Sequence, residues 1–511
     1  MSASQNLGGP SSCGRALGPC LDKIVKNAAW RKHSHLVSSC KSVLDKLESL
    51  PADSISISIS SSHSPLFSLS PSDANLVLNP ILLALDSAYP KVVDPALECL
   101  FKLFSSGLIR GEINHTPSSL IILKIIESVC KVCGIGDEAV ELSVLRVLLA
   151  AVRSPCVLIR GECLVHIVRT CYNVYLGGLN GTNQICAKSV LAQIMLVVFT
   201  RVEEDSMDVN VKTVSVGELL QFTDKNLNEG SSIHFCQNFV NEVMAASEGI
   251  PDDKLLLHNQ PSDELRNGSA GAGDDDDKIA EGGHKSELGN KEAKGEADTD
   301  AGVGVSGGGG GEVGGSKIRE DGFLLFRNIC KLSMKFSSQE TPDDQILLRG
   351  KILSLELLKV IMDNGGPIWR NNERFLNAIK QFLCLSLIKN TALSVMAIFQ
   401  LQCSIFMMLL VKFRSGLKEE IGIFFPMLVL RVLENVNQPS FLQKMTVLNF
   451  LDKISQDSQI IVDIFINYDC DVDAPNIYER YLQDCQWSSE NCSGTASWFN
   501  NDFVLSPGYY F

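Results

Sequence analysis

The 511-residue sequence has no long apolar run in its first part: residues 1–18 are polar, which predicts a chain without a secretory signal. Its 17 cysteines stand singly within apolar stretches, as at Cys99, Cys171, Cys330 and Cys403. This distribution argues against a disulfide framework and is typical of buried, reduced thiols. The sequence therefore indicates a cytoplasmic protein.

Signatures of catalysis and of nucleotide or metal binding are also missing. Residues 302–307 have the spacing of a dinucleotide fingerprint, but they lie in a glycine run without a preceding strand. Asp469, Asp471 and Asp473 resemble the start of a calcium loop, but its sixth position holds Ala474 instead of glycine. We find no Ser/His/Asp arrangement and no paired-carboxylate cleft. The sequence therefore predicts no catalytic residue, no metal site and no cofactor.

Two further short motifs have a simpler structural explanation. Cys130 and Cys133 form a lone pair without a second pair at zinc spacing, on an apolar helical pattern, which predicts buried thiols. His33 and His35 stand in a basic stretch, for which we expect a solvated helix face or, alternatively, contact with an anionic membrane surface. The basic residues of this stretch are Lys23, Lys26, Arg31 and Lys32.

Acidity is concentrated in one segment. The net charge is −14, and residues 261–316 contain 13 acidic against 5 basic residues together with 16 glycines. A segment with so few apolar side chains cannot bury enough surface to offset the entropy of ordering. We therefore predict a disordered acidic, glycine-rich linker over residues 247–316. The acidity also argues against nucleic acid as a partner.

Helical periodicity dominates the remainder. The pattern around Asp94 and Pro95 predicts a helix that begins there, buries one face from Leu97 to Phe104 and ends at Gly107 in the left-handed conformation. Other stretches, such as residues 139–152 and 189–202, are apolar on nearly every side and must lie between neighbouring helices. No alternating strand pattern of comparable length competes with them.

The predicted fold is all-α: an armadillo/HEAT-like helical solenoid in two blocks joined by a disordered linker. A pair of globular helical domains is the alternative. Its expected parts are a disordered N-terminus (1–16), a helical domain (17–246), the linker (247–316), a second helical domain (317–485) and an atypical aromatic tail (486–511). Such a linker permits the two blocks to separate or to dock on one another.

Two segments are ambiguous. Residues 54–62 alternate isoleucine with serine, but nearby prolines favour a serine-rich loop over a strand. Residues 393–411 are apolar enough to suggest a membrane span, but Gln400 and Gln402 interrupt them, so a buried core helix is favoured.

Longer segments, in a consistent order, resemble one family. They are residues 168–176, 183–188, 321–327, 330–335, 425–427 and 443–452, and the stretch 450–481. Together they resemble the large brefeldin-A-inhibited guanine nucleotide-exchange proteins, which act on Arf-family GTPases, and the acidic linker is most similar to plant members. The first block resembles the dimerisation and cyclophilin-binding (DCB) region and the second the homology upstream (HUS) region. The resemblance ends after Gln483, so we expect the tail to be a foreign end.

This resemblance implies an armadillo-like N-terminal region in Golgi or endosomal vesicle-mediated transport. It implies a homodimer through the DCB-like region, an Arf-family GTPase as partner, and peripheral association with an anionic membrane surface of the trans-Golgi network or endosomes. Family members catalyse GDP release with a glutamate in a Phe-Arg-Leu-Pro-Gly-Glu loop, which nothing in this sequence matches. We therefore expect no exchange activity from this chain alone. The alternative is a free-standing helical-repeat scaffold unrelated to Arf.

One motif is the candidate interaction site. It consists of Asn467, Tyr468, Asp469, Cys470 and Asp471. The resemblance implies that it serves contact between the two N-terminal blocks. The acceptors of Asn467, Asp469 and Asp471 also suit capping or pairing with basic groups at a helix end. A local turn at the end of a structural helix is an equally good interpretation.

Overall fold

The computed structural model describes most of the chain outside the linker and the tail. The described residues are 7–29, 31–50, 64–113, 120–221, 230–248, 250, 316–335, 345–393, 395–434, 439–480 and 482–483. We call those up to residue 250 the first block and those from 316 to 483 the second block. Both blocks belong to one compact unit. The ambiguous segment 54–62, the glycine motifs and the aromatic tail lie outside the described residues.

The first block consists of helices and one small sheet. Its elements are α1 (Ser12–Asn27), α2 (Ser34–Ser49), α3 (Pro71–Asp86), α4 (Pro90–Ser105), β1 (Gly111–Ile113), α5 (Leu120–Val132), the 3-10 turn η2 (Cys133–Ile135), α6 (Glu138–Arg153), β2 (Val157–Ile159), α7 (Gly161–Gly177), α8 (Gly181–Glu204), α9 (Val216–Leu219) and α10 (Gly230–Ala246).

The described part of the second block is helical throughout, with π-helical stretches at η5, η7 and η8. Its elements are α11 (Lys317–Ser333), α12 (Gln345–Asn364), α13 (Pro367–Asn371), α14 (Glu373–Ala378), η5 (Ile379–Cys384), α15 (Leu385–Asn390), α16 (Met396–Phe413), η6 (Arg414–Gly416), α17 (Lys418–Phe425), η7 (Pro426–Leu430), α18 (Arg431–Leu433), α19 (Phe441–Ser455), α20 (Ser458–Ile464) and η8 (Phe465–Asp469).

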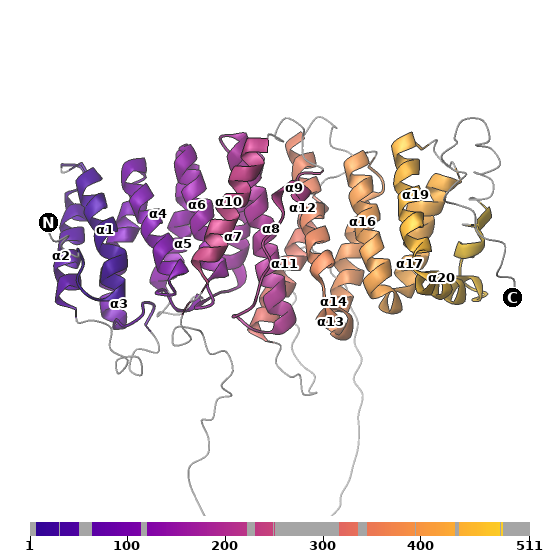
Figure 1. Cartoon of the computed structure of the whole chain (residues 1–511), viewed down its shortest axis with the longest axis horizontal. Helices are drawn as coiled ribbons and strands as arrows, with labels where there is room; N and C mark the ends of the chain where they lie inside the picture. The colour runs from indigo at the N-terminus through magenta and orange to yellow at the C-terminus, as the bar shows by residue number, and fades with distance from the viewer. Residues whose placement is uncertain are drawn as a thin grey trace, which may run out of the picture. The chain divides into compact units, whose positions relative to one another are not determined.

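The helices stack in two layers that run through both blocks. In one layer α1 packs on α4, α4 on α6, α6 on α8, α8 on α12, α12 on α16 and α16 on α19. In the other, α3 packs on α5, α5 on α7 and α7 on α11 (Figure 1). Each helix thus buries its apolar stripe against its neighbours, as in armadillo and HEAT repeats. The all-α solenoid is confirmed. The blocks are docked, and one hydrophobic core continues from α1 to η8.

The first helical domain was expected from residue 17, whereas the first described helix begins at Ser12, where the side chain of Ser11 accepts the backbone N–H of Gly14 and caps the helix. One predicted helix start is wrong. Helix α4 begins at Pro90, not at Asp94, so Pro95 lies inside it. A proline there leaves one helix carbonyl without its donor.

That carbonyl finds another donor. It belongs to Lys91, and it accepts a 2.8 Å hydrogen bond from the side chain of Asn27 on α1. The predicted end of the helix is confirmed, since Gly107 has a left-handed φ of 63°.

The short parallel sheet was not predicted. Gly111 pairs with Val157 and Ile113 with Ile159. Three residues are too few for an alternating pattern to stand out in a sequence. The sheet matters because it places the loop after β2, with Arg160, beside α11 of the second block.

Within the described residues, two helices are long and apolar enough to cross a membrane by length and composition, α8 and α16. In α8, 89% of the apolar window is buried within the protein, and in the segment Met396–Gly416 the share is 56%. Helix α16 packs between α12 and α19. This arrangement favours the core-helix interpretation of residues 393–411.

Candidate functional site

The predicted interaction motif, residues 467–471, lies where η8 continues α20 and meets the start of α17. Tyr468 is 4% exposed, and its hydroxyl donates a 2.7 Å hydrogen bond to the carbonyl of Lys418. Burial raises the pKa of Tyr468, which keeps the phenol protonated. Its ring packs against Gly422, where a Cβ would approach it to 3.3 Å. Tyr468 thus anchors the motif to α17.

Asp469 and Asp471 act as acceptors, as predicted from their chemistry. Asp469 accepts the backbone N–H groups of Tyr478 at 2.9 Å and of Glu479 at 2.8 Å, in the helical turn 477–480. These amides have no intrahelical acceptor, so the carboxylate caps the turn. Asp471 accepts a 2.8 Å bond from Lys418 Nζ, which holds the pKa of that carboxyl below its ordinary value.

The other two members behave differently. Asn467 donates from Nδ2 to the carbonyl of Asp463 at 2.7 Å, so its amide serves as a donor within the helix instead of an acceptor at its end. Cys470 is exposed. The hydrogen bonds of the motif tie η8 to α17 and to the turn that follows. A contact between the motif and the first block stays a prediction.

A second group of polar residues joins the two blocks. Arg160, directly after β2, donates from Nε to Asp321 at 2.9 Å, from Nη1 to Glu112 at 3.1 Å and from Nη2 to Glu320 at 3.1 Å. Asp321 on α11 also accepts the backbone N–H of Gly161 at 2.8 Å, at the N-terminus of α7. A carboxylate there is stabilised by the free amides and the helix dipole. This network fixes α11 against the first block.

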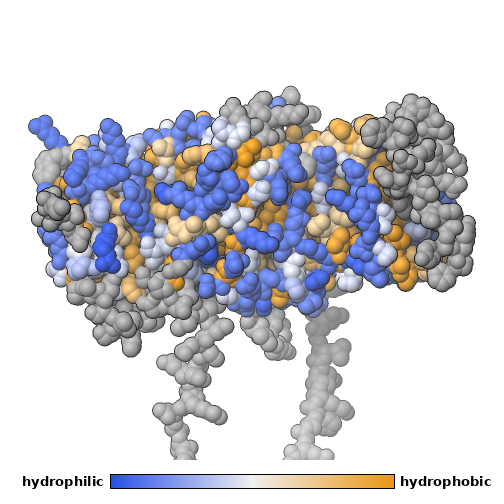
Figure 2. Space-filling view, in the orientation of Figure 1, coloured by the Kyte–Doolittle hydropathy of each residue, from blue (hydrophilic) through white to orange (hydrophobic). Residues whose placement is uncertain are grey.

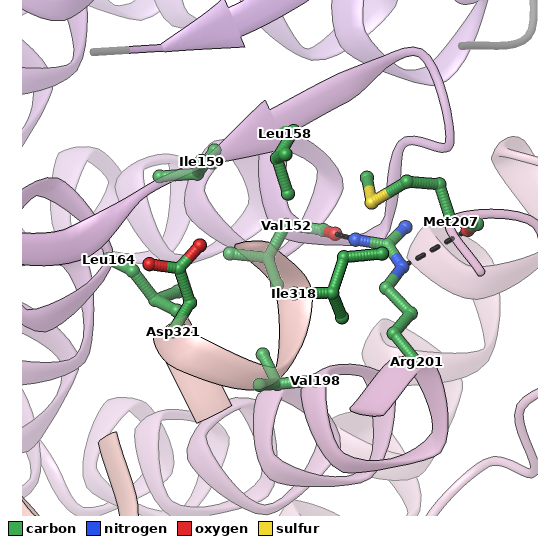
Figure 3. Close-up of a pocket in the computed structure, with 9 residues that line it drawn as sticks. All are labelled: Val152, Leu158, Ile159, Leu164, Val198, Arg201, Met207, Ile318 and Asp321. Carbon is green, nitrogen blue, oxygen red and sulfur yellow. Dashed lines mark hydrogen bonds between the residues drawn. The ribbon is translucent and has the colours of Figure 1, made fainter. Parts of the chain in front are cut away.

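A small cavity lies beside this network, between Asp321 and Arg201 (Figure 3). Apolar side chains, including Ile318 and Val198, line most of it. Its volume of about 30 Å³ has room for water but not for a larger ligand. We call the contact surface between the two blocks the joint. The cavity is therefore a packing defect of the joint and not a substrate site.

Arg201 on α8 has a structural role at the same place. Its guanidinium donates to the carbonyls of Val152 at 2.7 Å, Arg153 at 2.8 Å, Ser154 at 3.1 Å and Met207 at 3.1 Å. The first three belong to the C-terminal end of α6, whose last carbonyls need donors. Burial lowers the pKa of Arg201 to about 9. The cation stays charged at neutral pH and caps α6.

The middle of the joint contains a buried ion pair. Lys188 on α8 and Glu356 on α12 are 2.7 Å apart, with side chains 2% and 6% exposed. Burial lowers the pKa of Lys188 and raises the pKa of Glu356, although each group favours the charged form of the other. Beside them the hydroxyl of Tyr172 donates to the carbonyl of Gly350 at 2.6 Å. The blocks are therefore matched in polarity as well as in shape.

The lower end of the joint is aromatic. Trp369 on α13 is fully buried, and its ring lies 5.6 Å from Phe199 of the first block, 5.0 Å from Phe326 and 4.8 Å from Phe375. Glu203 on α8 accepts the backbone N–H of Ile368 at 2.8 Å, in the first turn of α13. Tilted aromatic contacts of this kind add to the energy of area burial.

Sequence reasoning did not identify this joint. One signal was present at Gly322, inside a predicted helix: a Cβ there would lie 2.3 Å from the side chain of Val202. A glycine in a helix interior often marks such a close approach. Lys188 and Glu356 were the other signal, since charges within apolar helices need partners. Which charge pairs with which, across 168 residues, only the fold could show.

The shorter motifs also have clear positions. Lys23 and Lys26 lie on the exposed side of α1 and pair with carboxylates of the same block. Arg31 and Lys32 are exposed in the turn before α2, so the basic stretch is not one continuous helix face. His33 is the residue before α2.

The two thiols of the Cys130/Cys133 motif are buried and partly buried, respectively. Burial raises the pKa of Cys130 to about 11 and that of Cys133 to about 12, so both are protonated at neutral pH.

Comparison with known proteins assigns both blocks. Residues 12–206 match the family described as the Mon2/Sec7/BIG1-like dimerisation and cyclophilin-binding domain, and residues 318–477 match the Mon2/Sec7/BIG1-like HUS domain. This helical solenoid is thus a DCB–HUS region.

Among curated relatives, brefeldin A-inhibited guanine nucleotide-exchange protein 1 of Arabidopsis thaliana is 62% identical over 482 residues, which are 94% of this chain and 26% of the relative. Protein 4 of the same plant is 60% identical, over 94% of this chain and 27% of the relative, and human protein 1 is 32% identical, over 92% and 31%. The chain belongs to the family of large brefeldin-A-inhibited guanine nucleotide-exchange proteins, and it spans about a quarter of the length of the plant relatives.

Proposed function

We propose that this chain is the regulatory, self-associating and membrane-recruiting region of an Arf guanine nucleotide-exchange factor in Golgi or endosomal vesicle transport. The observation that carries the proposal is the ordered pair of DCB and HUS matches, over residues 12–206 and 318–477. Their helices share one core, so a partner bound to one block is held in a fixed position relative to the other.

Recruitment and self-association, not nucleotide release, are the proposed activities of the chain itself. Its sequence has no match to the glutamate loop that carries exchange in the family. The expected partners are a second copy of the chain, an Arf-family GTPase and an anionic membrane surface at the trans-Golgi network or endosomes.

Co-sedimentation with liposomes tests the proposal. Liposomes rich in anionic lipid, with and without GTP-loaded Arf, are mixed with the purified chain, whose mass in solution is measured by light scattering. The proposal predicts Arf-dependent sedimentation and a mass larger than the 55.8 kDa of one chain. A monomer that binds neither Arf nor membrane would refute it, whereas binding to an unrelated partner alone would favour a scaffold outside Arf biology.

Charge variants separate membrane contact from Arf contact. Lys32 is exposed in the turn between α1 and α2, and Arg169 is exposed on α7. If the basic stretch contacts the membrane, Lys32→Glu reduces sedimentation with Arf-free anionic liposomes and Arg169→Glu does not. A nucleotide-release assay with Arf is expected to show no acceleration by the chain, and an acceleration would contradict the proposed division of labour.

A further inference from the structure

A groove on the second block is lined in part by Asn467 and Tyr468 of the Asn467–Asp471 motif and contains four cations in its lining. Arg370 comes from α13, Lys412 and Arg414 from the end of α16 and from η6, and Lys418 from the start of α17. The groove has a volume of about 660 Å³, which is large enough for several side chains. Asp463 is the carboxylate among its lining residues. Positive charge therefore exceeds negative charge around this space.

Two of the four cations are fixed in place by the fold. Lys412 Nζ donates to carbonyls at the C-terminal end of α12, among them Met362 at 3.2 Å and Gly365 at 3.4 Å. Arg414 donates from Nε to Asp463 at 2.5 Å. These bonds orient the two side chains at the wall of the groove, so that their charge adds to its field without large side-chain motion.

The other two cations keep donors for a ligand. Lys418 has three N–H donors and uses one of them in a hydrogen bond to Asp471. Arg370 is exposed, and within the described residues its guanidinium makes no hydrogen bond or ion pair. Burial lowers the pKa of Lys412; the carboxylate of Asp363 partly offsets this shift, and the charge of Arg370 adds to it. Arg370 and Lys412 thus repel each other, and an anion between them would relieve that repulsion.

Part of the remaining lining is apolar. Val411 is 42% exposed, whereas Leu410, Ile421 and Ile464, which also line the groove, are buried beneath it. Further exposed apolar side chains lie on the same elements, at Ile423, Phe465 and Ile466. Figure 2 shows apolar surface between polar patches at this end of the second block. A sugar phosphate would make no use of the apolar part of the lining, which we call the floor of the groove. A peptide that carries both carboxylates and apolar side chains matches the cations as well as this floor.

We propose that this groove binds a short acidic peptide segment of a partner protein. Its carboxylates face Arg370 and Lys418, and one of its aliphatic or aromatic side chains covers Val411. The proposal goes beyond recruitment to Arf and membrane, and it stands on the geometry of the second block. Charge-assisted contacts set the direction of the peptide, and the apolar floor supplies burial.

Fluorescence anisotropy tests the proposal on the full chain. The probe is a dye-labelled peptide in which Asp alternates with Leu and Phe, and the control peptide has Asn at every Asp. We expect saturable, salt-sensitive binding of the acidic probe alone. Arg370→Glu is expected to weaken binding roughly tenfold, since it reverses a charge at the rim of the groove. Val411→Asp is expected to weaken it by a similar factor.

Arg169→Glu is the matched control, because it reverses another exposed arginine, on α7 of the first block. It is expected to change the affinity by less than about twofold. Thermal unfolding of all three variants shows whether each retains the fold of the parent chain. Arg370 and Val411 are exposed, so both substitutions are compatible with folding.

Two kinds of result would overturn the proposal. One is an absence of saturable binding, or equal weakening by Arg370→Glu and Arg169→Glu. The other is binding of inositol hexakisphosphate, or of vesicles with phosphoinositide, that depends on Arg370 while the acidic peptide does not bind. That result would identify a phosphate site. Neither result bears on Arf-dependent sedimentation, so failure here is distinguishable from failure of the proposed function.

Discussion

The two blocks share one architecture but differ in how they use their apolar side chains. Among the described residues, six large apolar side chains are exposed in the first block and fourteen in the second. The π-helical stretches described, η5, η7 and η8, all lie in the second block. Helix segments of this type often mark functional sites. The difference shows that, within the described residues, the second block leaves more of its apolar side chains exposed than the first block does.

The joint explains part of this asymmetry. Helix α8 is apolar around most of its circumference, and it is covered by α6, α7 and α10 on one side and by α12 on the other. Without the second block this helix would expose a large apolar face to water, at a cost of about 25 cal/mol for each Å². The far end of the second block, around α19 and α20, instead presents exposed side chains such as Phe441 and Ile466.

The largest expected effect concerns the aromatic end of the joint. Trp369→Ala removes a fully buried indole that touches both blocks, and it should lower the free energy of unfolding by about 3–5 kcal/mol. Phe441→Ala is the control in the second block, because that ring is 76% exposed, and it should cost less than about 0.5 kcal/mol. Urea denaturation measures both. An equal loss of unfolding free energy in the two variants would contradict the difference between the joint and the far end of the second block.

The buried ion pair of the joint should show the cost of burying charge. Glu356→Leu removes the carboxylate that Lys188 contacts in the core and should destabilise the chain by about 3–5 kcal/mol. The double variant Lys188→Met/Glu356→Leu should recover most of that loss, since burial disfavours the charged form of both groups. A double variant no more stable than Glu356→Leu alone, in the same denaturation experiment, would contradict this account of the joint.

A smaller effect is expected at the Asn467–Asp471 motif. Tyr468→Phe removes the buried hydrogen bond to the Lys418 carbonyl and should cost about 1 kcal/mol. Hydrogen exchange should accelerate around η8 and the start of α17, with no change in the first block. Tyr89→Phe, at a partly exposed ring before α4, is the matched control. Acceleration across both blocks would show that the motif also supports the joint.

The smallest expected effect is a pH dependence of the local stability around η8, at the far end of the second block. Bonds from Arg414 and Lys418 hold the pKa of Asp463 and of Asp471 below the ordinary carboxyl value. Because the folded pKa lies below the unfolded one, their stabilisation is present above the ordinary value and is lost as the pH falls through the lowered one. Hydrogen exchange, corrected for its intrinsic pH dependence, should therefore show η8 loosening in acid before α8. Simultaneous loosening would remove this distinction.

Much of the fold could be predicted from periodicity, and the errors have physical causes. The start of α4 was misplaced because Pro95 is a good first residue of a helix, and only the fold brings Asn27 to the carbonyl that Pro95 leaves free. The sheet was missed because its strands have three residues each. The acceptor roles of Asp469 and Asp471 followed from their chemistry, but their partners depend on how the turn 477–480 and α17, respectively, pack against η8.

The central claim, that the two blocks form one body through the joint, can be tested by cutting between them. A protease site placed within residues 261–315 leaves every described helix intact, and the cleaved chain is then measured by size-exclusion chromatography with light scattering. The account predicts that both fragments elute together with the mass of the uncut protein, and that Trp369→Ala promotes their separation. Fragments that separate in the parent chain, each still helical, would contradict it.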